Sequence, residues 1–259
     1  MLKLYLYFHN INIMKIAIAF YGITRSLKYT INSIEESFFN VFKENNIDYD
    51  IYIHTYQLNK FENKRTNEIK NDIDNDEYKL LKPTYAQRDN QDDIKKEIDI
   101  ESYRTFPDPW NTDYNSVDNF ILACYSRFQV TNIIKKKNIN YDYILFTRPD
   151  CMYPYKFNVE YLRKADNNNI VIPLPPPSGK PEFNDRFCIT NMKTYTIYGN
   201  LFQDLFNISK ERSLHAEQVL QKYLKKHVSI KKIYFPFARI RCNGSVANLD
   251  KYCFNKKLN

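Results

Sequence analysis

The stretches IAIAFY (residues 16–21) and YDIYIHT (residues 49–55) decide the fold. Both are short runs of apolar, β-branched and aromatic residues, which is typical of strands buried in a parallel sheet. Between them, Ile31, Ile34 and Phe38 keep the spacing of an amphipathic helix. A strand, a helix and a second strand in this order form a βαβ unit with a right-handed crossover. The sequence therefore predicts an α/β fold.

The rest of the chain continues this pattern. We expect further strands at residues 141–147 (YDYILFT), 170–173, 183–189 and 228–235, and helices at 117–137, 159–165, 192–206 and 214–226. Ser116 is a plausible N-cap for the longest helix, and the lysines at residues 135–137 suit its C-terminal end. The expected architecture is a Rossmann-like, mostly parallel sheet that is flanked by helices.

We expect one domain over residues 14–235. Residues 1–13 are predicted to be a dispensable leader, because Met14 and Lys15 directly precede the first strand. Residues 57–115 are rich in charge and predict an insertion or lid with one or two short exposed helices. A solvated excursion without a functional role explains this stretch equally well. Residues 236–259 are expected to form a C-terminal tail.

The composition excludes several classes of protein. The chain has 259 residues, of which 43% are hydrophobic, so it can bury a sizeable core. Only 4 glycines are present, which excludes collagen-like and glycine-linker architectures. No apolar run approaches the roughly 20 residues that a membrane span requires. The five cysteines lack CxxC spacing, which argues against a zinc site or a disulfide framework and favours a cytoplasmic location.

The net charge of +8 raises the possibility of nucleic-acid binding. However, basic residues are scattered among acidic ones, and an A/T-rich codon bias explains the excess of lysine. We therefore expect no nucleic-acid partner, although a positive face would help to capture an anionic nucleotide diphosphate.

Arg148-Pro149-Asp150 directly follows the expected strand 141–147. In open α/β sheets, ligands bind outside the carboxyl ends of the strands. A carboxylate at this point can ligate a divalent cation, and an adjacent arginine can pair with phosphate oxygens. An ordinary salt bridge at the end of a strand explains the tripeptide about as well.

The turn after the first strand contains Tyr21, Gly22 and Arg25. Gly22 permits a tight turn, Tyr21 offers a stacking face for a base, and Arg25 can reach a phosphate. The turn lacks GxGxxG and GxxxxGK[ST], so neither dinucleotide binding nor a P-loop is supported.

Two later motifs carry candidate catalytic groups. Asn184, Asp185 and Arg186 place three hydrogen-bonding side chains in a row, which suits a polyhydroxylated ligand, although a local ion pair at a turn explains them too. His215 and Glu217 lie at the start of an expected helix, where the positive helix end favours an ionised carboxylate. Glu217 is the first candidate for a general base, Asp185 is the second, and a plain helix-end charge is the alternative.

The order of these motifs resembles that in a group of GT-A-fold, nucleotide-sugar-dependent glycosyltransferase-like proteins of bacteria and large DNA viruses. The resemblance covers most of the chain from Met14 to about Leu224, and residues 57–115 match least. The Arg-x-Asp strand end and the NDRF segment (residues 184–187) are its most specific parts.

The resemblance implies the function and the site, and, if the protein is viral, a location in the host cytoplasm or the virion. It implies that Asp150 is the metal ligand for Mn²⁺ or Mg²⁺, in place of a DxD pair. It implies that Glu217 or Asp185 is the catalytic base. The nucleotide sugar, with a UDP-linked donor favoured, would be bound by Tyr21, Gly22, Thr24, Arg25, His54, Thr55, Arg148, Asn184, Arg186 and His215. The expected activity is transfer of a hexosyl or pentosyl group to a hydroxyl of a glycan or protein. The alternatives are a non-catalytic nucleotide-sugar-binding protein and a basic nucleic-acid-associated protein.

Overall fold

The computed structural model describes residues 13–174 and 183–254. The predicted leader, apart from residue 13, lies outside the described residues, as do residues 175–182, which include most of the proline-rich stretch at 173–181.

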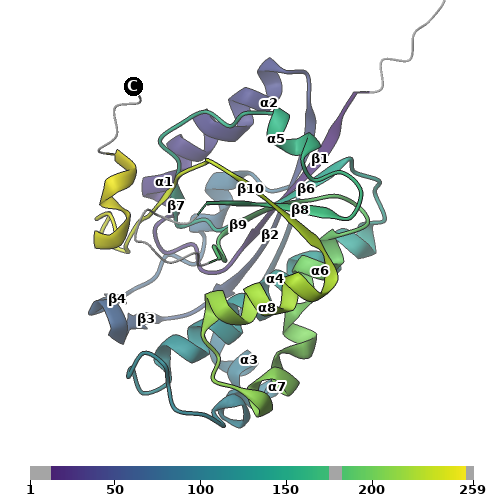
Figure 1. Cartoon of the computed structure of the whole chain (residues 1–259). Helices are drawn as coiled ribbons and strands as arrows, with labels where there is room; N and C mark the ends of the chain where they lie inside the picture. Colours follow the sequence, from purple (N-terminus) through teal and green to yellow (C-terminus); the bar gives the residue numbers. More distant parts are fainter. Residues whose placement is uncertain (1–12, 175–182, 255–259) are drawn as a thin grey trace, which may run out of the picture.

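A seven-stranded sheet forms the centre of the described part of the chain (Figure 1). Its strand order is β10-β8-β9-β6-β1-β2-β5. The bounds are β1 (Lys15–Tyr21), β2 (Asp48–Gln57), β5 (Tyr85–Asn90), β6 (Tyr143–Thr147), β8 (Asn169–Pro173), β9 (Phe187–Thr190) and β10 (Ser229–Ile233). Strand β9 runs antiparallel to its neighbours β6 and β8, and the other pairs are parallel.

Helices cover both faces of this sheet (Figure 1). One face carries α1 (Leu27–Ile34), a π-helical turn (Glu35–Phe39), α2 (Asn40–Glu44) and α5 (Glu160–Arg163). The other carries α4 (Asn115–Lys137), α6 (Tyr195–Gly199), α7 (Leu201–Glu211) and α8 (Ala216–His227). Side chains of β1 alternate between the two cores, with Ile16, Ile18 and Phe20 on the first side and Ala17, Ala19 and Tyr21 on the second.

These features confirm the predicted class, a mostly parallel sheet flanked by helices. The stretch at residues 57–115 holds more regular structure than we predicted. It contains the hairpin of β3 (Lys60–Asn63) and β4 (Glu68–Asn71), the helix α3 (Gln91–Glu97), and β5, which joins the central sheet at its edge. Short 3-10 turns occur at Lys64–Thr66, Glu77–Leu81 and Ile100–Tyr103.

The stretch that we predicted as a C-terminal tail packs against the domain. It contains β11 (Ala238–Arg239), which pairs antiparallel with β7 (Cys151–Met152), and a 3-10 helix (Asn248–Phe254). Among the described residues, each helix is either too short or too polar to cross a membrane.

Candidate functional site

A cleft of about 560 Å³ lies at the carboxyl edge of the central sheet. The ends of β1 and β6 reach this edge, and so does the start of β9, because β9 runs in the opposite direction. The first turn of α8, the N-terminal part of α4, the β3–β4 hairpin and residues between 239 and 249 form its other walls. The cleft brings together most of the charged residues that we singled out: Arg25, Arg148, Asp150, Asp185, Arg186 and Glu217.

The turn after β1 has the backbone that we expected. Gly22 adopts a φ of +99°, which favours glycine, and its amide donates a hydrogen bond of 2.8 Å to Ser126 Oγ. Tyr21 does not offer the predicted stacking face, because it is only 1% exposed. Its hydroxyl donates a 2.6 Å hydrogen bond to the carbonyl of Asp185, and its ring lies near the Arg127 guanidinium. Tyr21 therefore holds the segment before β9 in place.

Asp150 is 1% exposed and is bound by two arginines. Arg148 donates to both of its oxygens, from Nε to Oδ1 at 2.9 Å and from Nη2 to Oδ2 at 2.6 Å. Arg25 Nη2 lies 3.4 Å from Oδ2. Burial acts to raise the pKa of Asp150, but the guanidiniums of Arg148 and Arg25 outweigh it and hold the pKa well below its usual range. Asp150 is thus an ionised carboxylate whose charge is already balanced.

This environment does not fit a divalent cation. Hard cations are held by several oxygen ligands, and carboxylates usually supply the charge. Within residues 13–174 and 183–254, no group of three or more His, Cys, Asp and Glu side chains is arranged to hold a metal. The polar side chains nearest to Asp150 are guanidiniums, which repel a cation. The predicted role of Asp150 as a metal ligand stays a prediction.

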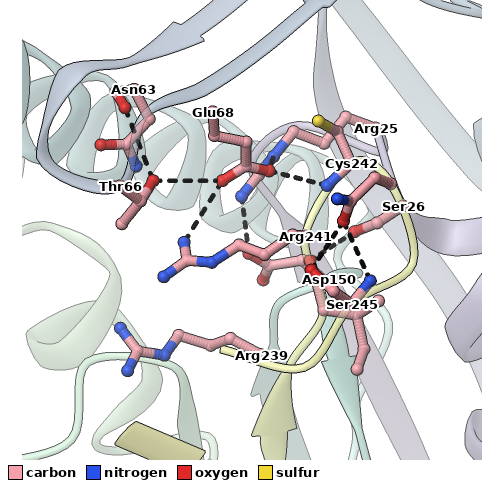
Figure 2. Close-up of polar contacts among 12 residues, drawn as sticks. Arg25, Ser26, Asn63, Thr66, Glu68, Asp150, Arg239, Arg241, Cys242 and Ser245 are labelled. Carbon is pink, nitrogen blue, oxygen red and sulfur yellow. Dashed lines mark hydrogen bonds and ion pairs between the residues drawn. The ribbon is translucent and has the colours of Figure 1, made fainter. Parts of the chain in front are cut away.

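Glu68 is a buried acidic residue that links the hairpin to the rest of the cleft (Figure 2). Its Oε1 accepts from Arg25 Nε at 3.3 Å and from the backbone amide of Cys242 at 2.7 Å, and its Oε2 accepts from Arg241 Nη1 at 3.3 Å. Burial acts to raise the pKa of Glu68, but the charge of Arg25 and the hydrogen bond from Cys242 outweigh it and lower the pKa. The ionised Glu68 therefore orients two arginines at once.

Residues 238–242 (ARIRC) form a cleft wall that we did not predict. Arg239 makes a bidentate ion pair with Asp250, with 2.7 Å from Nε to Oδ2 and 2.9 Å from Nη2 to Oδ1. The amide of Ile240 donates to the carbonyl of Asp150 at 2.8 Å. The hydroxyl of Ser26 donates to the carbonyl of Ile240 at 3.0 Å. The alternation of arginine with apolar residues in this stretch is the signal that could have marked it as a short strand with one polar face.

The two candidate bases lie close to one another through Arg186. Asp185 Oδ1 is 2.7 Å from Arg186 Nη1, and Glu217 Oε1 is 3.7 Å from Arg186 Nη2. Glu217 Oε2 also lies 3.5 Å from Nδ1 of His215, whose ring packs against Trp110. Burial acts to raise the pKa of Asp185, but Arg186, Arg148 and Arg127 outweigh it and lower the pKa, so Asp185 is a poor proton acceptor. Glu217 has no such close pair and faces the cleft.

Several predicted binding residues lie behind the cleft and do not line it. Thr24, His54, Thr55 and Asn184 are buried and are absent from the cleft walls. His215 is also absent from the walls, although it contacts Glu217.

His54 supports the turn after β1 from below. Its Nδ1 lies 2.8 Å from Ser126 Oγ, which accepts the amide of Gly22, and its Nε2 lies 2.9 Å from Asp89 Oδ2. Burial lowers the pKa of His54, although Asp89 opposes this shift. Ser126 is fully buried, so this His–Ser–Asp group is a support and not a nucleophile.

No family model matches the chain, and no curated protein matches it. The solved structures similar to it include a glycosyltransferase involved in the glycosylation of the major capsid of PBCV-1, with 9% identity, a TM-score of 0.46, and coverage of 85% of this chain and 82% of that one. The galactosyltransferase LgtC, in complex with donor and acceptor sugar analogues, has 12% identity, a TM-score of 0.44, and coverage of 84% and 73%. Mouse xyloside xylosyltransferase 1 has 14% identity, a TM-score of 0.41, and coverage of 85% and 84%. These structural neighbours are glycosyltransferases of low sequence identity, and the function proposed next rests on the residues of the cleft.

Proposed function

We propose that the protein is a glycosyltransferase, which moves a sugar from a nucleotide-sugar donor to a hydroxyl group of a glycan or protein acceptor. The observation that supports this most is the composition of the cleft. Guanidinium groups that can bind a diphosphate and the carboxylate of Glu217, which can accept a proton, face the same space at the carboxyl edge of the sheet.

The turn after β1 is the proposed site of the nucleotide. Gly22 leaves open space where a side chain would stand, since a Cβ built on it meets no atom within 4 Å. A ligand can therefore approach the backbone closely. Arg25 and Arg148 lie next to this turn and offer cationic donors to phosphate. UDP-linked donors remain the favoured substrates.

Glu217 is the proposed general base for a transfer with inversion. In this reaction the bond between the anomeric carbon and the diphosphate oxygen breaks, and its electron pair stays on the diphosphate. The acceptor oxygen forms the new bond to the anomeric carbon and gives its proton to the carboxylate of Glu217. Arg186 and His215 flank this carboxylate and orient it.

Trp110 is the proposed platform for a sugar acceptor. Its indole ring lines the cleft on the same side as Glu217 and packs on His215, with ring centroids 5.1 Å apart. The guanidinium of Arg65 lies 5.4 Å from its ring centroid on the hairpin side. A rigid aromatic ring at this place offers apolar surface to the C–H face of a sugar at low entropic cost.

A panel of nucleotide sugars tests this function. The purified chain is incubated with each donor, and release of nucleoside diphosphate is measured with and without simple glycoside acceptors. We expect one donor to be hydrolysed slowly when no acceptor is present. Release of nucleoside diphosphate from this donor should become faster when a suitable acceptor is added. Binding of a donor without any turnover would support the non-catalytic alternative, and the absence of both binding and turnover would refute the proposal.

A further inference from the structure

More arginines than carboxylates line the cleft, and Arg239 and Arg241 have no role in the reaction as proposed above. Six arginines line it, against three carboxylates: Arg25, Arg65, Arg148, Arg186, Arg239 and Arg241, and Asp150, Asp185 and Glu217. No lysine or histidine lines it within the described residues. Such a surplus of fixed guanidinium groups in a concave site attracts an anion with several charges.

The ion pairs in the cleft leave some of these guanidiniums only partly compensated. Arg241 and Arg25 share one carboxylate, that of Glu68, each on a different oxygen. Among the described residues, the only hydrogen bond of the Arg241 side chain is the one from Nη1 to Glu68, so the other guanidinium donors remain for a ligand. The Nε of Arg186 is buried and has no hydrogen-bond partner among the described residues. An unmet donor of this kind at the edge of a cleft indicates a missing acceptor.

Two like charges, those of Arg239 and Arg25, act on Arg241. In Figure 2 the side chains of Arg239 and Arg241 extend in the same direction, below the hairpin. Burial and the positive charges of Arg239 and Arg25 lower the pKa of Arg241, although Glu68 opposes them. Arg239 is paired with Asp250 through Nε and Nη2, which leaves Nη1 for a ligand. An anion placed between Arg239 and Arg241 would relieve the remaining repulsion and could bind a donor of each guanidinium.

The carboxylates offer no comparable site for a cation. Both oxygens of Asp150 accept from Arg148, and Arg25 approaches one of them. Asp185 is paired with Arg186. A divalent cation would have to displace these arginines and enter a site whose net charge is already positive.

We infer that Arg239 and Arg241, with Arg186, bind the diphosphate of the donor and stabilise it as it leaves, so that no divalent cation is required. This inference rests on the proposed function, since it names how the same cleft holds a diphosphate-linked donor. When the glycosyl bond breaks, the leaving diphosphate gains one negative charge, and fixed guanidiniums offset it without rearrangement.

Calorimetry with UDP and with inorganic pyrophosphate tests the inference. Each probe is titrated into the full chain in EDTA, and again with excess Mn²⁺ in place of EDTA. We expect both probes to bind in EDTA, with no more than a small gain from Mn²⁺. Arg241→Met should weaken both by about 10-fold or more, since a hydrogen bond to a charged group is worth roughly 1.5–3 kcal/mol.

Matched variants show whether a loss of affinity comes from the arginine site itself or from a lower net charge of the protein. Arg163→Met removes an exposed guanidinium on α5, whose side chain is 69% exposed, and should leave both affinities unchanged. Arg241→Lys keeps the charge beside Glu68 but loses the fork, and should give an intermediate loss. If Arg241→Met lowers thermal stability, the affinities of Arg241→Lys are compared with those of the unmodified chain instead.

The outcomes distinguish this inference from the proposed function. If UDP binds only with Mn²⁺ and Asp150→Asn abolishes that binding, the inference is overturned, Asp150 is a metal ligand, and the glycosyltransferase proposal stands. If neither probe binds under any condition, both proposals fail. If binding is independent of metal and depends on Arg241, the arginine site is supported, even if no donor in the panel is turned over.

Discussion

His54 illustrates how a polar residue can serve a site without touching the ligand. The imidazole links Asp89 on β5 to Ser126 on α4, and Ser126 in turn binds the amide of Gly22. The Asp89 carboxylate can only accept, so Nε2–H donates to it. The Ser126 hydroxyl donates to the backbone carbonyl of His54 at 2.9 Å, and its oxygen lies 2.8 Å from Nδ1. The resemblance implied that His54 binds the nucleotide sugar, but residues 51–56 of β2 are all buried, so His54 lies in the interior and acts as a positioning residue.

The stability of the fold should depend on pH through His54. Burial lowers the pKa of His54 in the folded chain below its ordinary value of 6.5. Below about pH 6.5 the unfolded chain therefore binds a proton that the folded chain does not, and the free energy of unfolding falls as pH falls. The slope from this one group is at most about 1.4 kcal/mol per pH unit. Urea unfolding measured between about pH 5.5 and 7.5 checks it.

A pair of histidine variants identifies the source of this slope. His54→Gln should lower the free energy of unfolding at neutral pH and reduce its dependence on pH. His227→Gln alters an exposed histidine at the end of α8 and should leave the slope as it is. An unchanged slope in His54→Gln would show that another group causes the acid sensitivity.

Glu217→Gln should reduce transfer by about 10²-fold or more, the usual contribution of a positioned base. The amide has the same shape and still fits between Arg186 and His215, so the fold and donor binding should persist. Steady-state transfer and donor affinity are measured together. Glu211→Gln, at the exposed end of α7, is the matched control. Lost donor affinity with intact turnover would make Glu217 a binding residue, and no change in either would leave it a helix-end charge.

Strands with a high apolar content could be predicted from the sequence, whereas a strand with mostly polar side chains could not. Strands β1, β2 and β6 were predicted because runs such as IAIAFY and YILFT are buried on both faces. The edge strand β5 (YAQRDN) was missed, because every second residue is exposed and its other side chains are polar as well. An edge strand in a charged segment carries no strong periodic signal.

The same physical reason explains which residues of the candidate site could be predicted from the sequence and which could not. Arg148, Asp150 and Asp185 adjoin buried strands, so their place at the sheet edge follows from the strand pattern. Arg239 and Arg241 follow no such strand. Their place depends on pairing of β11 with β7 and on the contact of Arg241 with Glu68, which is 173 positions away in the chain. Contacts this distant have no local signature, so the sequence alone could not place the C-terminal segment in the cleft.

The close packing of α6 on α4 gives a prediction about the stability of the fold. A Cβ at Gly199 would collide with the hydroxyl and methyl groups of Thr131, so the two helices approach closely at this point. Gly199→Ala should therefore destabilise the fold by about 1–3 kcal/mol, despite the better helix propensity of alanine. Urea denaturation measures this cost. Adding Thr131→Ala, which removes two of the three colliding atoms (Oγ1 and Cγ2), should recover part of the stability. A double variant no better than additive would argue against a direct clash.

For the whole molecule, the net charge of +8 is divided between a concave arginine site and scattered surface lysines. Several of these lysines pair with acidic residues on the same helix or turn: Lys79 with Asp76, Lys95 with Asp92, and Lys96 with Asp93. Phosphates of a duplex are contacted by a continuous row of cations. Charge that is concentrated in a cleft instead suits a small, multiply charged ligand.

We therefore expect duplex DNA to bind more weakly than micromolar at physiological salt. Fluorescence anisotropy with a short labelled duplex over a series of salt concentrations measures the affinity and its salt dependence. The slope of log affinity against log salt counts the phosphates contacted, at about 0.9 per contact, and a chain without a basic stripe should give a shallow slope. UDP added as a competitor shows whether any residual binding uses the cleft. Sub-micromolar affinity with a steep slope that UDP leaves unchanged would place a nucleic-acid surface outside the cleft. This result would favour the basic nucleic-acid-associated alternative, because the arginine cleft would then not account for the protein's charge.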